Sequence, residues 1–444
     1  MFKLKGLLKN SYIVASGTLI SRILGYLREI AVTAWLGTGA ASDAFVIASR
    51  IPALFRRVAT EGGLQNVLIP ILNELEKFKR KNIISSLITK IMVILTSVYL
   101  SALCFSVLFP KFYLSLVAPG IINKPVRLFW ALKFNFYTTA SIIFFFLSGL
   151  FSAVLNNRNK FFWPSIAPAF FNITITGLTM IAYIFDISVI YIGHFFLISS
   201  VAQMLACLIP YLNLNIPINL NKADKKDPAI EKFFKKFIPV VFSSSTAQIG
   251  SLVAIILSSY LAEGSTTIMH RAERFFQLPL SIAASFSTAL LPSLSKASQN
   301  KVSLRKTAIK VTVAIFIPFS IFLYFLSEPL VKMTFLHGKC TLSDTQRIAE
   351  IIKLYSFGIP SFLLTRVLPI FFFAEGLTKI PTRAAIANTI VDIVISILLI
   401  TPLQSTGLVL AQIISSWANT IILIYFIIKK GYLKEEKETI AKEV

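Results

Sequence analysis

Apolar runs long enough to cross a lipid bilayer recur along this chain and limit what it can fold into. A helix needs about 20 mostly apolar residues to span the hydrocarbon core, where its backbone must satisfy its own hydrogen bonds. The chain is 55% hydrophobic and only 14% charged, which leaves too little polar surface for a soluble protein of 444 residues. We predict an all-α polytopic membrane protein with about twelve transmembrane helices, near residues 11–36, 40–60, 84–109, 129–155, 161–185, 188–212, 236–262, 267–292, 305–327, 347–376, 382–401 and 405–428.

Basic residues are concentrated in alternate loops between these spans, 28 on one side against 6 on the other. Because cytoplasmic loops carry the excess of lysine and arginine, we expect both termini in the cytoplasm. The longest polar connector, 213–231, is then a cytoplasmic linker between two six-helix lobes. These lobes are residues 1–212 and residues 232–444, the second ending in a short charged tail.

The formal net charge of +24 does not indicate nucleic-acid binding, because the basic residues lie in short loops between apolar spans. The chain has no P-loop, no H-E-x-x-H, no G-x-S-x-G and no dinucleotide fingerprint. Its three cysteines are far apart and form no C-x-x-C, so no metal site is expected from them. We therefore expect neither an enzyme nor a cofactor.

Arginines interrupt the first predicted span, where Arg22 and Arg28 lie six residues apart. An arginine at the bilayer centre costs roughly 2.5–3.5 kcal/mol, so such residues usually face a wet cavity or bind something anionic. Guanidinium matches phosphate oxygens bidentately and stays charged. The sequence thus predicts a cationic cavity lined by these arginines, with an anionic substrate. The alternative is a set of structural ion pairs with Asp43 or Glu61.

Two further groups of charged residues have a functional and a structural interpretation. Arg56, with Glu61 close behind it, either meets phosphate at the inner mouth of the cavity or is a basic anchor at the membrane edge. Glu273 and Arg274 lie in the eighth span. In the functional interpretation they line the cavity, and in the structural one they form a charge cluster at the membrane interface.

Asn388 and Asp392 are spaced i, i+4 in the eleventh span and present oxygens on one helix face. They are weak candidates for a cation site. The alternative is a buried carboxylate that is hydrogen-bonded to a neighbouring helix.

Several motifs resemble those of one transporter family. They are SRILGYLREI (21–30), ASDAF (41–45), RIPALFRRVATEG (50–62), RAERFFQLP (271–279) and LLPSLSK (290–296). Together they resemble the MurJ (MviN) lipid II flippases over essentially the whole chain, and the first 65 residues are the most specific part.

The resemblance implies the fold of the multidrug/oligosaccharidyl-lipid/polysaccharide exporter superfamily, with two lobes around a central cavity. The implied substrate is lipid II, which is undecaprenyl-diphosphate carrying the peptidoglycan disaccharide-pentapeptide, in the bacterial cytoplasmic membrane. By motif position the resemblance assigns substrate-binding roles to Arg22, Arg28, Asp43, Arg56, Glu61, Glu273 and Arg274. The family typically has fourteen spans, and the pair beyond our twelve is thought to help form a groove for the lipid tail.

We therefore expect translocation of lipid II from the inner to the outer leaflet by alternating access, for cell-wall synthesis, driven by the membrane potential or by a monovalent cation. Two alternatives share the superfamily. A polysaccharide repeat-unit flippase would use the same diphosphate chemistry, and a multidrug or cation antiporter would favour acidic residues in the cavity. The expected partners are lipid II and membrane lipids.

Overall fold

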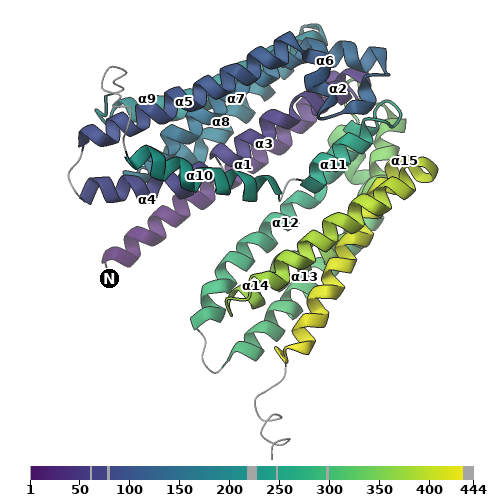
Figure 1. Ribbon diagram of the computed structural model, residues 1–444. Coiled ribbons are helices and arrows are strands. Elements are labelled where there is room, and N and C mark those ends of the chain that lie inside the picture. Colours follow the sequence, from purple (N-terminus) through teal and green to yellow (C-terminus); the bar gives the residue numbers. More distant parts are fainter. Residues whose placement is uncertain are drawn as a thin grey trace, which may run out of the picture. The chain divides into compact units, whose positions relative to one another are not determined.

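The structure, a computed structural model, describes residues 2–60, 63–77, 81–217, 228–246, 249–296 and 300–433. Every regular element within these ranges is a helix (Figure 1). Contacts divide the chain into two compact units. Unit 1 comprises Met1–Gly264 and His337–Cys340, and unit 2 comprises Ser265–Leu336 and Thr341–Val444. The prediction of an all-α polytopic protein is confirmed.

Unit 1 is built around a long buried helix, α7. Its helices are α1 (Phe2–Leu36), α2 (Ala40–Ala48), α3 (Arg50–Thr60), α4 (Gly63–Lys77), α5 (Lys81–Leu108), α6 (Pro110–Ser115), α7 (Pro125–Asn157), α8 (Phe162–Ile184), α9 (Ile192–Leu212), α10 (Pro228–Thr246) and α11 (Ile249–Ser258), with short 3₁₀ turns η1 (Pro119–Ile121) and η2 (Val189–Tyr191). Helix α7 packs against α2, α3, α4, α5, α8 and α9. Because protein surrounds it, α7 buries polar side chains such as Asn135, Thr138 and Ser148 beside its apolar ones.

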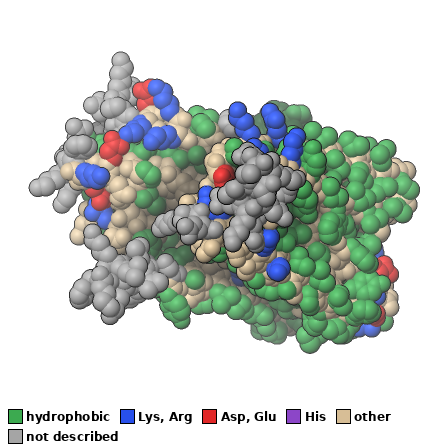
Figure 2. Space-filling view, turned by 90° about the horizontal axis from the view of Figure 1, so that it is seen from below, with side chains coloured by type: hydrophobic (Ala, Val, Ile, Leu, Met, Phe, Trp, Pro, Cys, Tyr) green, Lys and Arg blue, Asp and Glu red, His purple; other side chains and the backbone are tan. Residues whose placement is uncertain are grey.

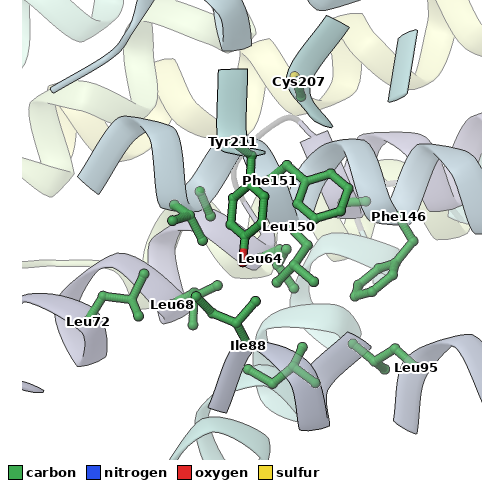
Figure 3. Packing of buried hydrophobic residues seen from close by; sticks show 14 of the residues in the cluster. Leu64, Leu68, Leu72, Ile88, Leu95, Phe146, Leu150, Phe151, Cys207 and Tyr211 are labelled. Carbon is green, nitrogen blue, oxygen red and sulfur yellow. The ribbon is translucent and has the colours of Figure 1, made fainter. Parts of the chain in front are cut away.

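A cluster of apolar side chains from several helices fills one end of unit 1. Figure 3 shows Leu68 of α4, Ile88 of α5, Leu150 and Phe151 of α7 and Tyr211 of α9 converging on one another. All five are almost fully buried. Within the bilayer, close packing of these side chains rather than their removal from water stabilises the cluster, because lipid tails are as apolar as the side chains.

Helix α1 lies along α8 through small residues. A Cβ atom added at Gly17 would stand 2.5 Å from the Oγ atom of Ser165. One turn further, the backbone carbonyl of Ser21 accepts a hydrogen bond from Asn172. Small residues of this kind let membrane helices approach closely. The close packing brings the side chains of α1 beyond Ser21 against the middle of α8.

Within the described residues, unit 2 has four long helical elements, the last of which is two helices joined at a kink. They are α12 (Ser265–Lys296), α13 (Lys301–Phe335), α14 (Leu342–Phe373) and α15 (Lys379–Lys429). Helix α14 packs against the other three. A capping box starts it, in which Thr341 and Asp344 exchange side-chain to backbone hydrogen bonds.

Seven described helices are long and apolar enough to cross a membrane, or eight if the bent pair in α12 counts as one span. Two of the twelve predicted spans lie within α15, which has a non-helical residue, Gln404, at the predicted boundary. The predicted span 40–60 is two helices, α2 and α3, which meet at Ser49. Figure 2 shows hydrophobic side chains covering the right part of the visible face, whereas Lys and Arg side chains gather over its left and central parts.

The contact-based boundary falls after Gly264, not in the predicted linker 213–231, of which residues 218–227 lie outside the described ranges. Helix α10 groups with unit 1 because Phe233 and Phe237 join its core cluster. An ion pair between Lys232 and Glu74 of α4, at 2.5 Å, adds to this packing. The predicted lobes were defined by the order of spans along the chain, whereas the two units are defined by which helices pack together.

The packing of α3 on α7 predicts the effect of a single methyl group. A Cβ atom at Gly149 would overlap the backbone oxygen of Ala59. We expect Gly149→Ala to destabilise the protein by about 1–3 kcal/mol, because neither backbone can yield without a shift of the helix. Thermal unfolding in detergent measures this. The control is Gly177→Ala on α8, where nothing lies within 4 Å; it should leave the midpoint unchanged or raise it. Equal midpoints for the two variants would contradict the prediction.

Candidate functional site

Arg28 reaches from α1 towards α8. Three groups contact its guanidinium, one on α1 and two on α8. It forms an ion pair with Glu29, its neighbour in the chain. Its Nη1 atom donates a hydrogen bond to the Oδ1 atom of Asn172, at 3.3 Å. Its guanidinium carbon lies 5.9 Å from the centre of the Phe171 ring. The side chain is 18% exposed, so the charge is shielded by protein but still accessible from one side.

Arg56 of α3 meets the same ring. Its guanidinium carbon lies 5.1 Å from the centre of the Phe171 ring and 5.5 Å from that of Phe145. Cations over aromatic rings at these distances are attracted by the negative face of the ring. The structure therefore brings together two of the predicted arginines, Arg28 and Arg56, which are 28 positions apart in the chain.

Of two other predicted residues, the structure places one away from this group and does not describe the other. Arg22 lies on α1 but is exposed, since α8 contacts a different side of the helix. Glu61 lies outside the described residues. We call the site formed by Arg28, Arg56, Phe171 and Asn172 the arginine pair site. It contains the predicted arginines of unit 1 that the structure brings together.

Asp43 lies in a buried network of its own. Its Oδ2 atom is 3.5 Å from the Nε atom of Arg127 and accepts a hydrogen bond of 2.8 Å from the backbone amide of Gly264. Both charged side chains are fully buried. Arg127 also donates to the carbonyl oxygens of Ser259 and Leu261. Asp43 thus fastens the segment that leads into α12, and it forms its ion pair with Arg127, whereas the ion-pair alternative had joined it to Arg22 or Arg28.

Lys124 contacts the same segment at the start of α7. Its Nζ atom donates a 2.7 Å hydrogen bond to the carbonyl oxygen of Tyr260. Burial and the nearby charge of Arg127 lower the pKa of Lys124, against the opposing effect of Asp43 and Glu263. The network therefore places two cations around one carboxylate and several carbonyl oxygens.

In unit 2, Arg274 is held by its own helix. Its Nη1 atom donates to the Oε1 atom of Gln277 at 2.9 Å, and its Nη2 atom lies 2.8 Å from the Nε2 atom of His270. Contacts three and four residues apart along α12 fix the direction of the guanidinium. Glu273 is half-buried, and Arg271 is almost fully buried. Arg274 is therefore preoriented within unit 2.

Asn388 and Asp392 carry buried oxygens in α15. The Oδ1 atoms of both residues are buried and have no hydrogen-bond partner within the described part of the chain. The alternative interpretation requires a hydrogen bond from a neighbouring helix to the carboxylate of Asp392. Within the described residues, the Oδ1 atom of Asp392 has no such bond. Two such oxygens one turn apart are suited to a hard monovalent cation.

Sequence reasoning did not foresee Phe145, Phe171, Asn172 or Arg127. The phenylalanines look like ordinary members of apolar spans, and their partners are more than 80 positions away. Asn172 offered one signal, as a polar residue inside an otherwise apolar stretch of α8, where an intramembrane polar side chain usually has a specific partner. Arg127 stands near the start of its span, where a basic residue reads as an interfacial anchor.

The Asp43–Arg127 pair predicts a non-additive effect on stability. Asp43→Ala leaves a buried guanidinium without its carboxylate, which costs about 3–5 kcal/mol. The double variant Asp43→Ala/Arg127→Met removes both charges and should recover part of that loss. Thermal unfolding of both in detergent measures the difference. A double variant whose loss equals or exceeds that of Asp43→Ala would show that the two residues are not coupled in this way.

Comparisons with known proteins agree with this architecture. The family model for lipid II flippase MurJ matches residues 32–443. The probable lipid II flippase MurJ of Buchnera aphidicola subsp. Acyrthosiphon pisum (strain APS) is 30% identical over 424 residues, which is 94% of this chain and 83% of that protein.

Solved structures resemble the fold as well. A structure of lipid II flippase MurJ in an inward closed conformation has a TM-score of 0.82 and 26% identity, over 95% of this chain and 89% of that one. An inward-facing multidrug resistance MATE family transporter of the MOP superfamily has a TM-score of 0.74 at 12% identity, over 95% and 98%, and shows the fold alone. With the family model matched over most of its length, this chain belongs to the lipid II flippase MurJ family.

Proposed function

We propose that this protein moves lipid II from the inner to the outer leaflet of the bacterial cytoplasmic membrane by alternating access. The observation that carries the proposal is the convergence of Arg28 of α1 and Arg56 of α3 on the buried ring of Phe171. Two guanidinium groups on one ring make a local positive charge, although Glu29 offsets part of it. Such a site is suited to an anion with oxygens on two adjacent centres, as a diphosphate has.

The proposed cycle follows from the cost of moving a charged headgroup through hydrocarbon, which is prohibitive without polar partners. The inward-open state takes the headgroup from the inner leaflet, and Arg28 and Arg56 bind its diphosphate. By motif position Arg22 and Arg274 also bind the headgroup, and the protein then opens outward. The polyprenyl tail stays in lipid throughout. The charge asymmetry of the loops supports an orientation with both termini in the cytoplasm.

The membrane potential supports both halves of this cycle. It is worth about 2.3 kcal/mol for each charge moved across 100 mV. With the inside negative, outward movement of the anionic headgroup is downhill, and so is the return of an empty, positively charged site. We propose in addition that Asn388 and Asp392 bind a monovalent cation that couples to this return.

Replacing Arg28 tests the anion site. We expect Arg28→Ala to abolish lipid II translocation, because the guanidinium that binds the diphosphate is lost. Arg28→Lys should keep part of the rate, since the charge remains while the bidentate geometry is lost. The measurement is the accessibility of the lipid II headgroup at the outer face of proteoliposomes, with membrane insertion checked by protease protection.

The matched control is Arg347→Ala, an exposed arginine near the start of α14. It should translocate at the wild-type rate. Wild-type translocation by Arg28→Ala would remove Arg28 from the binding site. A wild-type protein that moves polysaccharide-linked diphosphate lipids but not lipid II would assign the alternative flippase function.

Replacing Asp392 tests the coupling. Asp392→Asn keeps the shape of the side chain but removes the negative charge that a cation needs, so lipid II translocation should lose its dependence on an imposed Na⁺ or K⁺ gradient. Rates are compared in proteoliposomes with the membrane potential clamped at zero and at an inside-negative value. A wild-type rate that follows the potential and ignores both gradients would exclude cation coupling and leave the potential as the driving force.

A further inference from the structure

We propose that Phe171 and Asn172, adjacent in α8, are positioning residues that set the spacing and direction of the Arg28 and Arg56 guanidinium groups for a diphosphate. This inference rests on the proposed function, because it assigns the arginine pair site to substrate binding. Neither residue needs to touch the substrate. Each acts through an arginine that does.

Phe171 fixes the spacing of the two cations. Its ring is fully buried in the core of unit 1, so the ring itself cannot swing aside. Phe196 and Phe145 pack against it with ring centres 5.2 and 5.5 Å away. Two arginines from different helices lie within 6 Å of its centre. Each guanidinium carbon is held at a known distance from the ring centre. The two carbons can therefore be no farther apart than the sum of these two distances.

Holding two like charges close together is unfavourable unless something attracts both. The quadrupole of an aromatic ring attracts a cation without neutralising it, which a carboxylate would do. An aliphatic side chain of similar size would fill the same space and supply no such attraction. The ring at position 171 thus holds two cations near each other and adds no negative charge beyond that of Glu29, which pairs with Arg28.

Asn172 fixes the direction of Arg28. Its side-chain amide is buried, and its Nδ2 atom donates a 2.9 Å hydrogen bond to the carbonyl oxygen of Ser21 on α1. This bond determines which way the amide points, so the Oδ1 atom faces the Nη1 atom of Arg28. A neutral acceptor uses one of the five N–H donors of the guanidinium and adds no charge. Donors therefore remain for phosphate oxygens.

The test of the ring uses a matched pair of substitutions. Phe171→Leu removes the aromatic ring beneath both arginines. Phe134→Leu removes another fully buried phenylalanine from the same core cluster, one that has no arginine among its ring contacts in the described residues. We expect Phe171→Leu to raise the half-saturating mole fraction of lipid II by about tenfold, with little change in the maximal rate, and Phe134→Leu to leave it unchanged.

The test of the amide has its own control. Asn172→Asp keeps an oxygen beside Arg28 but brings a negative charge that competes with the diphosphate, so the half-saturating mole fraction should again rise by about tenfold. Asn135→Asp is the control, because Asn135 is equally buried and its Nδ2 atom also donates to a backbone carbonyl, that of Ser106. Both variants lose the same kind of hydrogen bond, and only one places a carboxylate next to an arginine of the site.

Binding of inorganic pyrophosphate to the purified protein separates this inference from the proposed function. If wild-type protein fails to translocate lipid II, the proposed function fails. The inference is then decided by calorimetry, where weaker pyrophosphate binding in Phe171→Leu and Asn172→Asp than in their controls supports it. Equal effects of each variant and its control, on affinity or on the half-saturating mole fraction, would show that residues 171 and 172 are merely structural and overturn the inference.

Discussion

A charged side chain that is buried between apolar helices must find its partner inside the protein, and the arrangement of unit 1 follows from that constraint. Where protein excludes water from a guanidinium, carboxylates, amides, carbonyls and aromatic rings take its place. Arg28, Arg56 and Arg127 have different kinds of partner: a carboxylate and an amide, aromatic rings, and a carboxylate with backbone carbonyls. The kind of partner determines what each arginine remains able to bind.

Arg127 and Arg56 illustrate the two outcomes. Arg127 is fully buried and is used by one carboxylate and two backbone carbonyls, so it holds the chain together. Arg56 lies over two aromatic rings. Contact with an aromatic ring attracts a guanidinium without cancelling its charge, whereas a buried carboxylate does cancel it. In this family a diphosphate lipid is the anion that such a site would meet.

Much of the fold could be predicted because hydrophobic length is a local property. The last two predicted spans, for instance, meet in the structure at Gln404, near Pro402, where the helical backbone is interrupted. Other features were less predictable. Helix α10 groups with unit 1 through Phe233, Phe237 and the Lys232–Glu74 pair, and contacts with α4 are not visible in the order of spans.

The sequence by itself determined that the chain crosses a membrane and that arginines lie where lipid would otherwise be, since both follow from local composition. Only the tertiary structure decided the partner of each arginine. Asp43 was grouped with the substrate-binding residues, yet it meets Arg127 and the amide of Gly264, while Phe171 and Asn172, unremarked in the sequence, hold Arg28. The physical reason is that ion pairs, hydrogen bonds and cation–ring contacts depend on distances of a few ångströms between helices, which helix–helix packing sets.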